Sequence, residues 1–245
     1  MVENIKGTFE IHLFVAPLNP DQETVDRFVQ ACERATTGPN HTVKGLFLYL
    51  DFEHLGYAGV LQSSRYTQGT IEDARRVVQE DCEMLEAAGF EVIRRKIECL
   101  ASNEGVPRNE QEDKEQLPGH YFEFHIKCVP TATTTVEEVQ AEQAVDVETL
   151  KQLSEKLSKE LNVRIPLSYN ALRPSQRFLN TRTYGLGRDP SFKTVEAIRE
   201  SINALGHIRV EKVIREFICQ DDNTALDAGW LEPLAYQNKP LPCAS

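Results

Sequence analysis

The chain has 245 residues, which is enough for two ordinary domains, each with its own apolar core. It contains 38 acidic and 27 basic residues, giving a net charge of -11, and it has no run of lysine and arginine. A nucleic-acid backbone or an anionic lipid surface would repel such a chain unless basic residues were concentrated locally. We therefore expect no generic nucleic-acid binding and no membrane association.

The cysteines and the N-terminal residues indicate a reducing compartment. The six cysteines form no Cys-x-x-Cys pair, and four of them fall in apolar helix or strand patterns, where a thiol behaves as a small hydrophobic group. The first eight residues include Glu3 and Lys6 and lack the apolar region of a signal peptide. No apolar stretch approaches the length needed to cross a bilayer. We expect reduced thiols and a cytoplasmic protein.

The first half of the chain predicts six elements in the order β-α-β-β-α-β. Residues 8–15 alternate apolar and other side chains, which is the pattern of a strand with one buried face. Thr70 with Asp73 is a capping pair that opens a helix, and Gly89 ends it. The full set is a strand at 8–15, a helix starting at Asn19-Pro20, strands at 43–50 and 57–67, a helix at 70–88 and a strand at 92–100.

The second half repeats this order after a polar stretch. His125, Arg182 and Gly206 recur at nearly the same spacing as His12, Arg65 and Gly89. The elements are a strand at 121–128, a helix capped by Asp146, strands at 165–171 and 177–184, a helix capped by Asp189 and a strand at 210–219.

These patterns predict an α+β fold made by tandem duplication of a ferredoxin-like β-α-β-β-α-β unit, in two pseudo-symmetric lobes. Such a unit forms a sheet of strand order 4-1-3-2 with both helices on one face. The predicted parts are a first repeat at 1–103, an acidic linker at 104–119, a second repeat at 120–223 and a C-terminal tail at 224–245 that packs on the body.

The first strand of each repeat places polar side chains on the face away from the helices. The apolar positions point toward the helices, so His12 and His125 lie on the opposite face, each next to a glutamate. The third and fourth strands add further charged side chains to this face. The candidate ligand-binding residues are Arg65, Arg182, Glu10, Glu123, Lys127 and Lys96.

A polar cleft between the lobes follows as the main functional hypothesis. Arg65 and Arg182 would contact a small anionic ligand, such as a phosphorylated molecule, because guanidinium groups suit phosphate and carboxylate. His12 and His125 are candidate acid/base catalysts, because imidazole has an unperturbed pKa near neutrality. The ligand, the oligomeric state and whether the protein is an enzyme at all remain open.

Two other functions fit the same residues. A divalent-metal enzyme would use carboxylate and imidazole ligands, for which the sequence offers His12, Glu98, His125 and Glu216. A non-enzymatic binding or scaffolding protein would use the polar face to contact another chain. No Gly-rich phosphate loop is present, so the cofactor is unknown and no nucleotide cofactor is indicated.

One strand histidine per lobe resembles the 2H phosphoesterases, which carry paired His-x-Thr or His-x-Ser motifs. The resemblance implies phosphodiester chemistry by the two histidines. Here the triplets are His12-Leu-Phe14 and His125-Ile-Lys127, which lack the hydroxyl residue at the third position.

Overall fold

A computed structural model describes residues 4–38, 42–49, 59–116, 119–131, 136–170, 173–227 and 231. The chain divides into two compact units. Unit 1 comprises residues 1–107, 114–121 and 216–228, and unit 2 comprises residues 108–113, 122–215 and 229–245. Trp230 and Cys243, with nearly all of the predicted C-terminal tail, lie outside the described residues.

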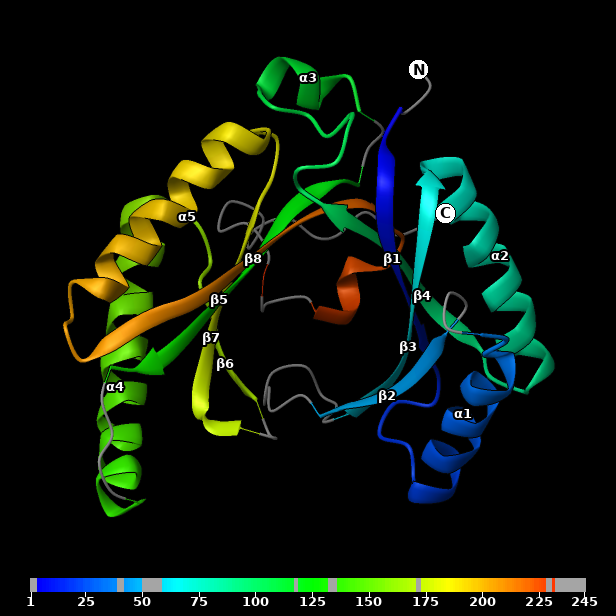
Figure 1. Cartoon of the computed structure of the whole chain (residues 1–245), viewed down its shortest axis with the longest axis horizontal. Coiled ribbons are helices and arrows are strands. Elements are labelled where there is room, and N and C mark those ends of the chain that lie inside the picture. The colour runs from blue at the N-terminus through cyan, green and yellow to red at the C-terminus, as the bar shows by residue number, and fades with distance from the viewer. Residues whose placement is uncertain are drawn as a thin grey trace. The chain divides into compact units, whose positions relative to one another are not determined.

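Unit 1 is an antiparallel sheet with two helices on one side (Figure 1). Its strand order is β2-β3-β1-β4-β8, and the first four strands have the order expected for a ferredoxin-like unit. Its elements are β1 (Lys6–Val15), α1 (Gln22–Ala35), β2 (Val43–Tyr49), β3 (Gly59–Thr70), α2 (Ile71–Ala87), β4 (Val92–Leu100), the end of β8 (Ile208–Asp221) and the 3-10 turn η1 (Thr224–Asp227).

Apolar residues on alternate positions of β1 form the core under the helices. Phe9, Ile11 and Leu13 are at most 1% exposed, and they lie on the sheet face that α1 and α2 cover. The predicted capping box of α2 is confirmed, because Thr70 and Asp73 each bond the backbone N–H of the other. The N-cap of α1 is Asp21 rather than Asn19, because the carboxylate of Asp21 accepts a bond from the Thr24 N–H.

Arg94 binds the C-terminal end of β8 within unit 1. Arg94 on β4 donates to both carboxylate oxygens of Asp221, at 2.9 and 2.6 Å, and to Asp227 in η1 at 3.2 Å. Tyr121 also donates to Asp221 at 2.7 Å. The paired charges explain why Arg94 can lie 96% buried without an uncompensated charge.

From β5 to β8, unit 2 has the same order of strands and helices as unit 1 has from β1 to β4. Its strand order is β8-β5-β7-β6, and Figure 1 shows its two long helices on one side of these strands. The elements are α3 (Glu110–Lys114), β5 (Tyr121–Pro130), α4 (Val136–Leu161), β6 (Leu167–Asn170), β7 (Arg173–Thr183), α5 (Arg188–Asn203) and the first part of β8. The short helix α3 lies in the stretch predicted as a linker. Helix α4 begins well before the predicted cap at Asp146, because the Glu, Gln and Ala residues there favour helix.

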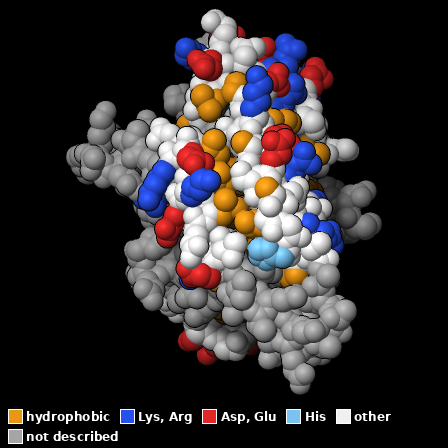
Figure 2. All heavy atoms as spheres, turned by 90° about the vertical axis from the view of Figure 1, so that its left-hand side faces the viewer, with side chains coloured by type: hydrophobic (Ala, Val, Ile, Leu, Met, Phe, Trp, Pro, Cys, Tyr) orange, Lys and Arg blue, Asp and Glu red, His pale blue; other side chains and the backbone are white. Residues whose placement is uncertain are grey.

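The outer surface of unit 2 carries charges of both signs. Figure 2 shows acidic and basic side chains interspersed along a band of hydrophobic ones. In unit 2, Glu196 forms ion pairs with Arg199 at 2.6 Å and with Arg215 at 2.9 Å. Among the described residues, no helix is long and apolar enough to cross a membrane.

The described cysteines behave as small hydrophobic side chains. All five of them are buried free thiols: Cys32, Cys82, Cys99, Cys128 and Cys219. Burial raises the pKa of Cys32 and of Cys128 to about 12. These thiols therefore stay protonated near neutral pH.

Arg65 lies on the helix-covered side of the sheet, so the expectation that it shares the face of His12 is wrong. The pairing of β1 with β3 sets Arg65 opposite Ile11, a core position. From there its guanidinium donates to Asp81 of α2 at 2.5 Å. Burial outweighs the attraction of Arg65 and raises the pKa of Asp81. Arg65 is therefore a structural partner of α2.

We expect Asp81→Ala to lower the free energy of unfolding by about 3 kcal/mol, because it removes the buried carboxylate that contacts the guanidinium of Arg65 at 2.5 Å. The carboxylate of Glu80, which is 4.0 Å away and exposed, compensates this largely buried charge less well. Replacing both residues with leucine removes the charge as well, so the double variant should lose less than Asp81→Ala. Urea unfolding measures both. A double variant that is as unstable as the single one would contradict this account of the pair.

Candidate functional site

The cluster on the open face of unit 1 is built from three adjacent strands. Strand β1 lies between β3 and β4, so each of its residues has a cross-strand neighbour on both sides. The register forms two rows of side chains, Tyr66–Glu10–Glu98 and Ser64–His12–Lys96. The pairing of β4 with β1 puts Lys96 and Glu98 on the same face as His12.

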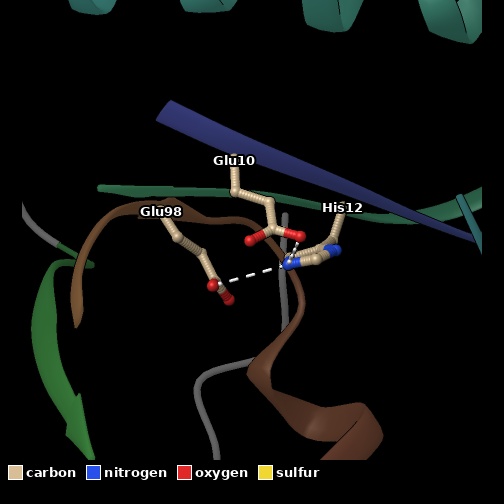
Figure 3. A group of neighbouring side chains, drawn as sticks. All are labelled: Glu10, His12 and Glu98. Atoms are coloured by element: carbon tan, nitrogen blue, oxygen red, sulfur yellow. Dashed lines mark ion pairs between the residues drawn. The ribbon is translucent and has the colours of Figure 1, made fainter. Parts of the chain in front are cut away.

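His12 points one ring nitrogen at two carboxylates (Figure 3). Its Nε2 lies 3.6 Å from Oε1 of Glu10 and 3.4 Å from Oε2 of Glu98. On the other side of the ring, the side-chain amide of Gln62 contacts Nδ1 at 2.6 Å. The amide thus fixes the ring so that Nε2 faces the gap between the two carboxylates.

Both carboxylates are held in place by other side chains. Ser64 donates to Oε1 of Glu10 at 2.7 Å, and Tyr66 also forms a hydrogen bond with Glu10. Lys96 forms a close ion pair with Oε1 of Glu98, which leaves Oε2 facing His12. Glu98 and Lys96 are 5% and 6% exposed, so these are interactions of a largely dry environment.

The pKa of His12 lies above its ordinary value. Burial, the largest influence, and the positive charge of Lys96 both favour the neutral ring. The charge of Glu98, its hydrogen bond to the ring and the charge of Glu10 together outweigh them. The charges of the metal-free cluster therefore favour the protonated ring more than water does.

The same three side chains have the geometry of a metal-ligand set. One donor atom each from Glu10, His12 and Glu98 lies within 4.8 Å of the other two. Ligand atoms at about 2.1 Å from a tetrahedral ion lie about 3.4 Å apart, close to the separations of Nε2 from the two carboxylate oxygens. Lys96 pairs with Oε1 of Glu98, so Oε2, the oxygen nearest His12, stays available to a metal ion. The sequence analysis named His12 and Glu98 as candidate metal ligands, and the structure adds Glu10 as the third.

Unit 2 contains a related but differently charged arrangement. His125 Nε2 lies 3.4 Å from Oε1 of Glu123, and Nδ1 donates to the side-chain oxygen of Asn180 at 2.6 Å. Arg182 pairs with Glu123 across the strands and donates to its Oε2 at 2.9 Å. Arg182 therefore shares the face of His125, as expected, but its charge is directed at Glu123.

The remaining predicted residues lie apart from these two groups. Lys127 pairs with Glu211 at 2.6 Å in unit 2. Glu216 belongs to unit 1 and lies opposite Leu100, beyond the row that contains Glu98. The pKa of Tyr66 is raised mainly by burial and by the hydrogen bond to Glu10. The negative charges of Glu10, Glu216 and Glu98 raise it further.

A polar pocket of about 440 Å³ borders the cluster in unit 1. Ser64 belongs to both, because it lines the pocket and donates to Glu10. The pocket was not predicted, although the run of polar residues in β3 was a signal for it. Its lining includes Thr8, Thr42, Lys44, Ser64, Tyr66 and Gln68.

We expect Glu98→Gln to lower the pKa of His12 in the metal-free protein, and by more than Glu10→Gln does, because Glu98 has the larger effect on the ring. An NMR titration of the imidazole measures both shifts. Because the folded pKa exceeds the unfolded value near 6.5, the stabilisation is complete below that pH. It is lost as the pH rises through the folded pKa. A His12 pKa below 6.5 in the wild type would contradict this picture.

Comparisons with known proteins leave the family open. No protein-family model and no curated protein matches the sequence. Among solved structures, one of a protein assigned provisionally as a chlorite dismutase covers 87% of this chain and 95% of its own, at 11% identity and a TM-score of 0.25. A likeness at this TM-score carries no argument about fold or function, so the site must be judged from its own geometry.

Proposed function

We propose that unit 1 is a metal-dependent catalytic module that binds one divalent transition-metal ion through Glu10, His12 and Glu98. The observation that carries the proposal is the position of His12 Nε2, 3.6 and 3.4 Å from oxygens of two carboxylates. One nitrogen and two oxygen donors suit zinc, manganese or ferrous iron better than copper(I), which prefers sulfur. A ring that binds a metal through Nε2 carries its proton on Nδ1, so Gln62, whose side-chain nitrogen lies 2.6 Å from Nδ1, has to turn its amide and present the carbonyl oxygen there.

Three protein ligands favour catalysis over a structural role. Structural zinc sites use four protein ligands, whereas catalytic sites keep a position for water or substrate. A metal ion at such a site supplies a Lewis acid and lowers the pKa of bound water. The reaction class that fits best is metal-assisted hydrolysis, in which His12 is a ligand rather than an acid/base catalyst.

An anion site built on the two predicted arginines has less support. The guanidinium of Arg65 is engaged by Asp81, and that of Arg182 by Glu123. Both arginines would have to give up buried ion pairs to contact a ligand, which would leave buried carboxylates uncompensated. The cluster around His12 is instead rich in carboxylate, which attracts a cation.

The duplication is part of the same proposal. Both units have the element order β-α-β-β-α-β and the strand order 4-1-3-2 expected of ferredoxin-like repeats. In both, a Glu-x-His pair on the first strand faces a side-chain amide or hydroxyl on the third. We infer two copies of one ancestral unit, of which only the first kept a metal site. In the second, Arg182 stands where Tyr66 stands in the first and neutralises Glu123.

Isothermal titration of the chelator-treated protein with Zn²⁺ tests the metal site. We expect one site in the wild type, and at least about a tenfold weaker affinity for His12→Ala and for Glu98→Gln, because each removes a ligand. His125→Ala is the matched control, since it removes the histidine of the second Glu-x-His pair and should leave the affinity unchanged. Equal losses in the His12 and His125 variants would contradict a site confined to unit 1.

A further inference from the structure

The pocket beside the cluster has a lining suited to a particular kind of ligand. Its walls include the ammonium group of Lys44, the hydroxyl of Thr8 and the side-chain amide of Gln68. The hydroxyls of Ser64 and Tyr66, also at the pocket, are hydrogen-bonded to Glu10. Hydroxyl and ammonium groups all donate hydrogen bonds, and a lysine acts as a point charge for phosphate and carboxylate. No carboxylate side chain is among the described residues that line it. The pocket therefore favours an oxygen-rich anion.

The strand register places Lys44 in line with His12. Lys44 of β2 pairs with Ser64 of β3, and Ser64 pairs with His12 of β1. The three side chains therefore lie on one face of the sheet, with Ser64 between the ammonium group and the imidazole. Ser64, which lines the pocket beside Lys44, also donates to Glu10, so this one side chain contacts both the pocket and the cluster.

Lys44 is available to a ligand. Within the described part of the chain it has no ion-pair partner, whereas Lys96 on the same row is bound to Glu98. Tyr66, at the pocket wall, is 54% exposed and bonded to Glu10, so its ring presents a surface while its hydroxyl is fixed. Among the lining residues that the structure describes, Lys44 is therefore the charged side chain without an ion pair.

We propose that this pocket binds the phosphate or carboxylate group of a small polar substrate through Lys44 and the side chains of Thr8 and Gln68. The inference rests on the proposed metal site for the chemistry at the other end of the substrate, but the anion site itself requires no metal. The substrate class is a small oxyanion-bearing molecule whose reactive group reaches past Ser64 toward Glu10, His12 and Glu98.

NMR titration of the metal-free protein with inorganic phosphate, and separately with acetate, tests the anion site. We expect saturable shifts of the backbone amides of Lys44, Ser64 and Tyr66 with at least one of the two anions. Phosphate alone indicates a phosphorylated substrate, and acetate alone or equally indicates a carboxylate. Lys44→Ala should weaken the binding about tenfold, the loss of one charged hydrogen bond.

Two control variants separate this proposal from others. Lys151→Ala removes the charge of an exposed lysine of α4 in unit 2 and should leave anion binding unchanged. Glu98→Gln should weaken Zn²⁺ binding at least about tenfold but keep the phosphate or acetate shifts. Absence of saturable shifts with both anions, or equal weakening by the Lys44 and Lys151 variants, would overturn the anion site. Loss of zinc binding alone would leave it standing.

Discussion

The pairing of β1 with β3 on one side and β4 on the other is the constraint on which the site depends. Phe9, Ile11 and Leu13 fill the core under the helices, which leaves Glu10 and His12 on the open face. A slip of one residue would exchange these sets and bury charges among apolar side chains. The core that holds the sheet together is therefore also what fixes the direction of the two central site residues.

The electrostatics of the cluster follow from that pairing. Two carboxylates converge on His12, and Lys96 compensates one of them from the side. A buried carboxylate pair needs a nearby positive charge, and either a proton on the imidazole or a metal ion can supply it. The proton and the metal compete for Nε2, so the raised pKa of His12 and the proposed metal site are two consequences of one charge arrangement.

Much of the fold could be predicted from periodicity and caps, because these signals are local. The alternation of β1 placed His12 on the open face, and Thr70 with Asp73 marked the start of α2. The face of Arg65 could not be predicted in this way, since polar residues occupy successive positions of β3 and no alternation distinguishes its two sides. The sequence pattern also gave no sign that Asp81 of α2 is the ion-pair partner of Arg65. The similar spacing of Arg65 and Arg182 suggested that they are equivalent residues of the two repeats. The strand register shows instead that Tyr66 of unit 1 occupies the position of Arg182 in unit 2.

The most direct measurement of the central claim is anomalous diffraction at the zinc absorption edge from crystals grown with Zn²⁺. The account predicts a strong peak about 2.0 to 2.2 Å from Nε2 of His12 and from one oxygen each of Glu10 and Glu98. The ion pair of Lys96 with Glu98 should persist beside it. A cluster without anomalous density in crystals that hold zinc elsewhere would contradict the claim, and the three side chains would then be a structural ion network.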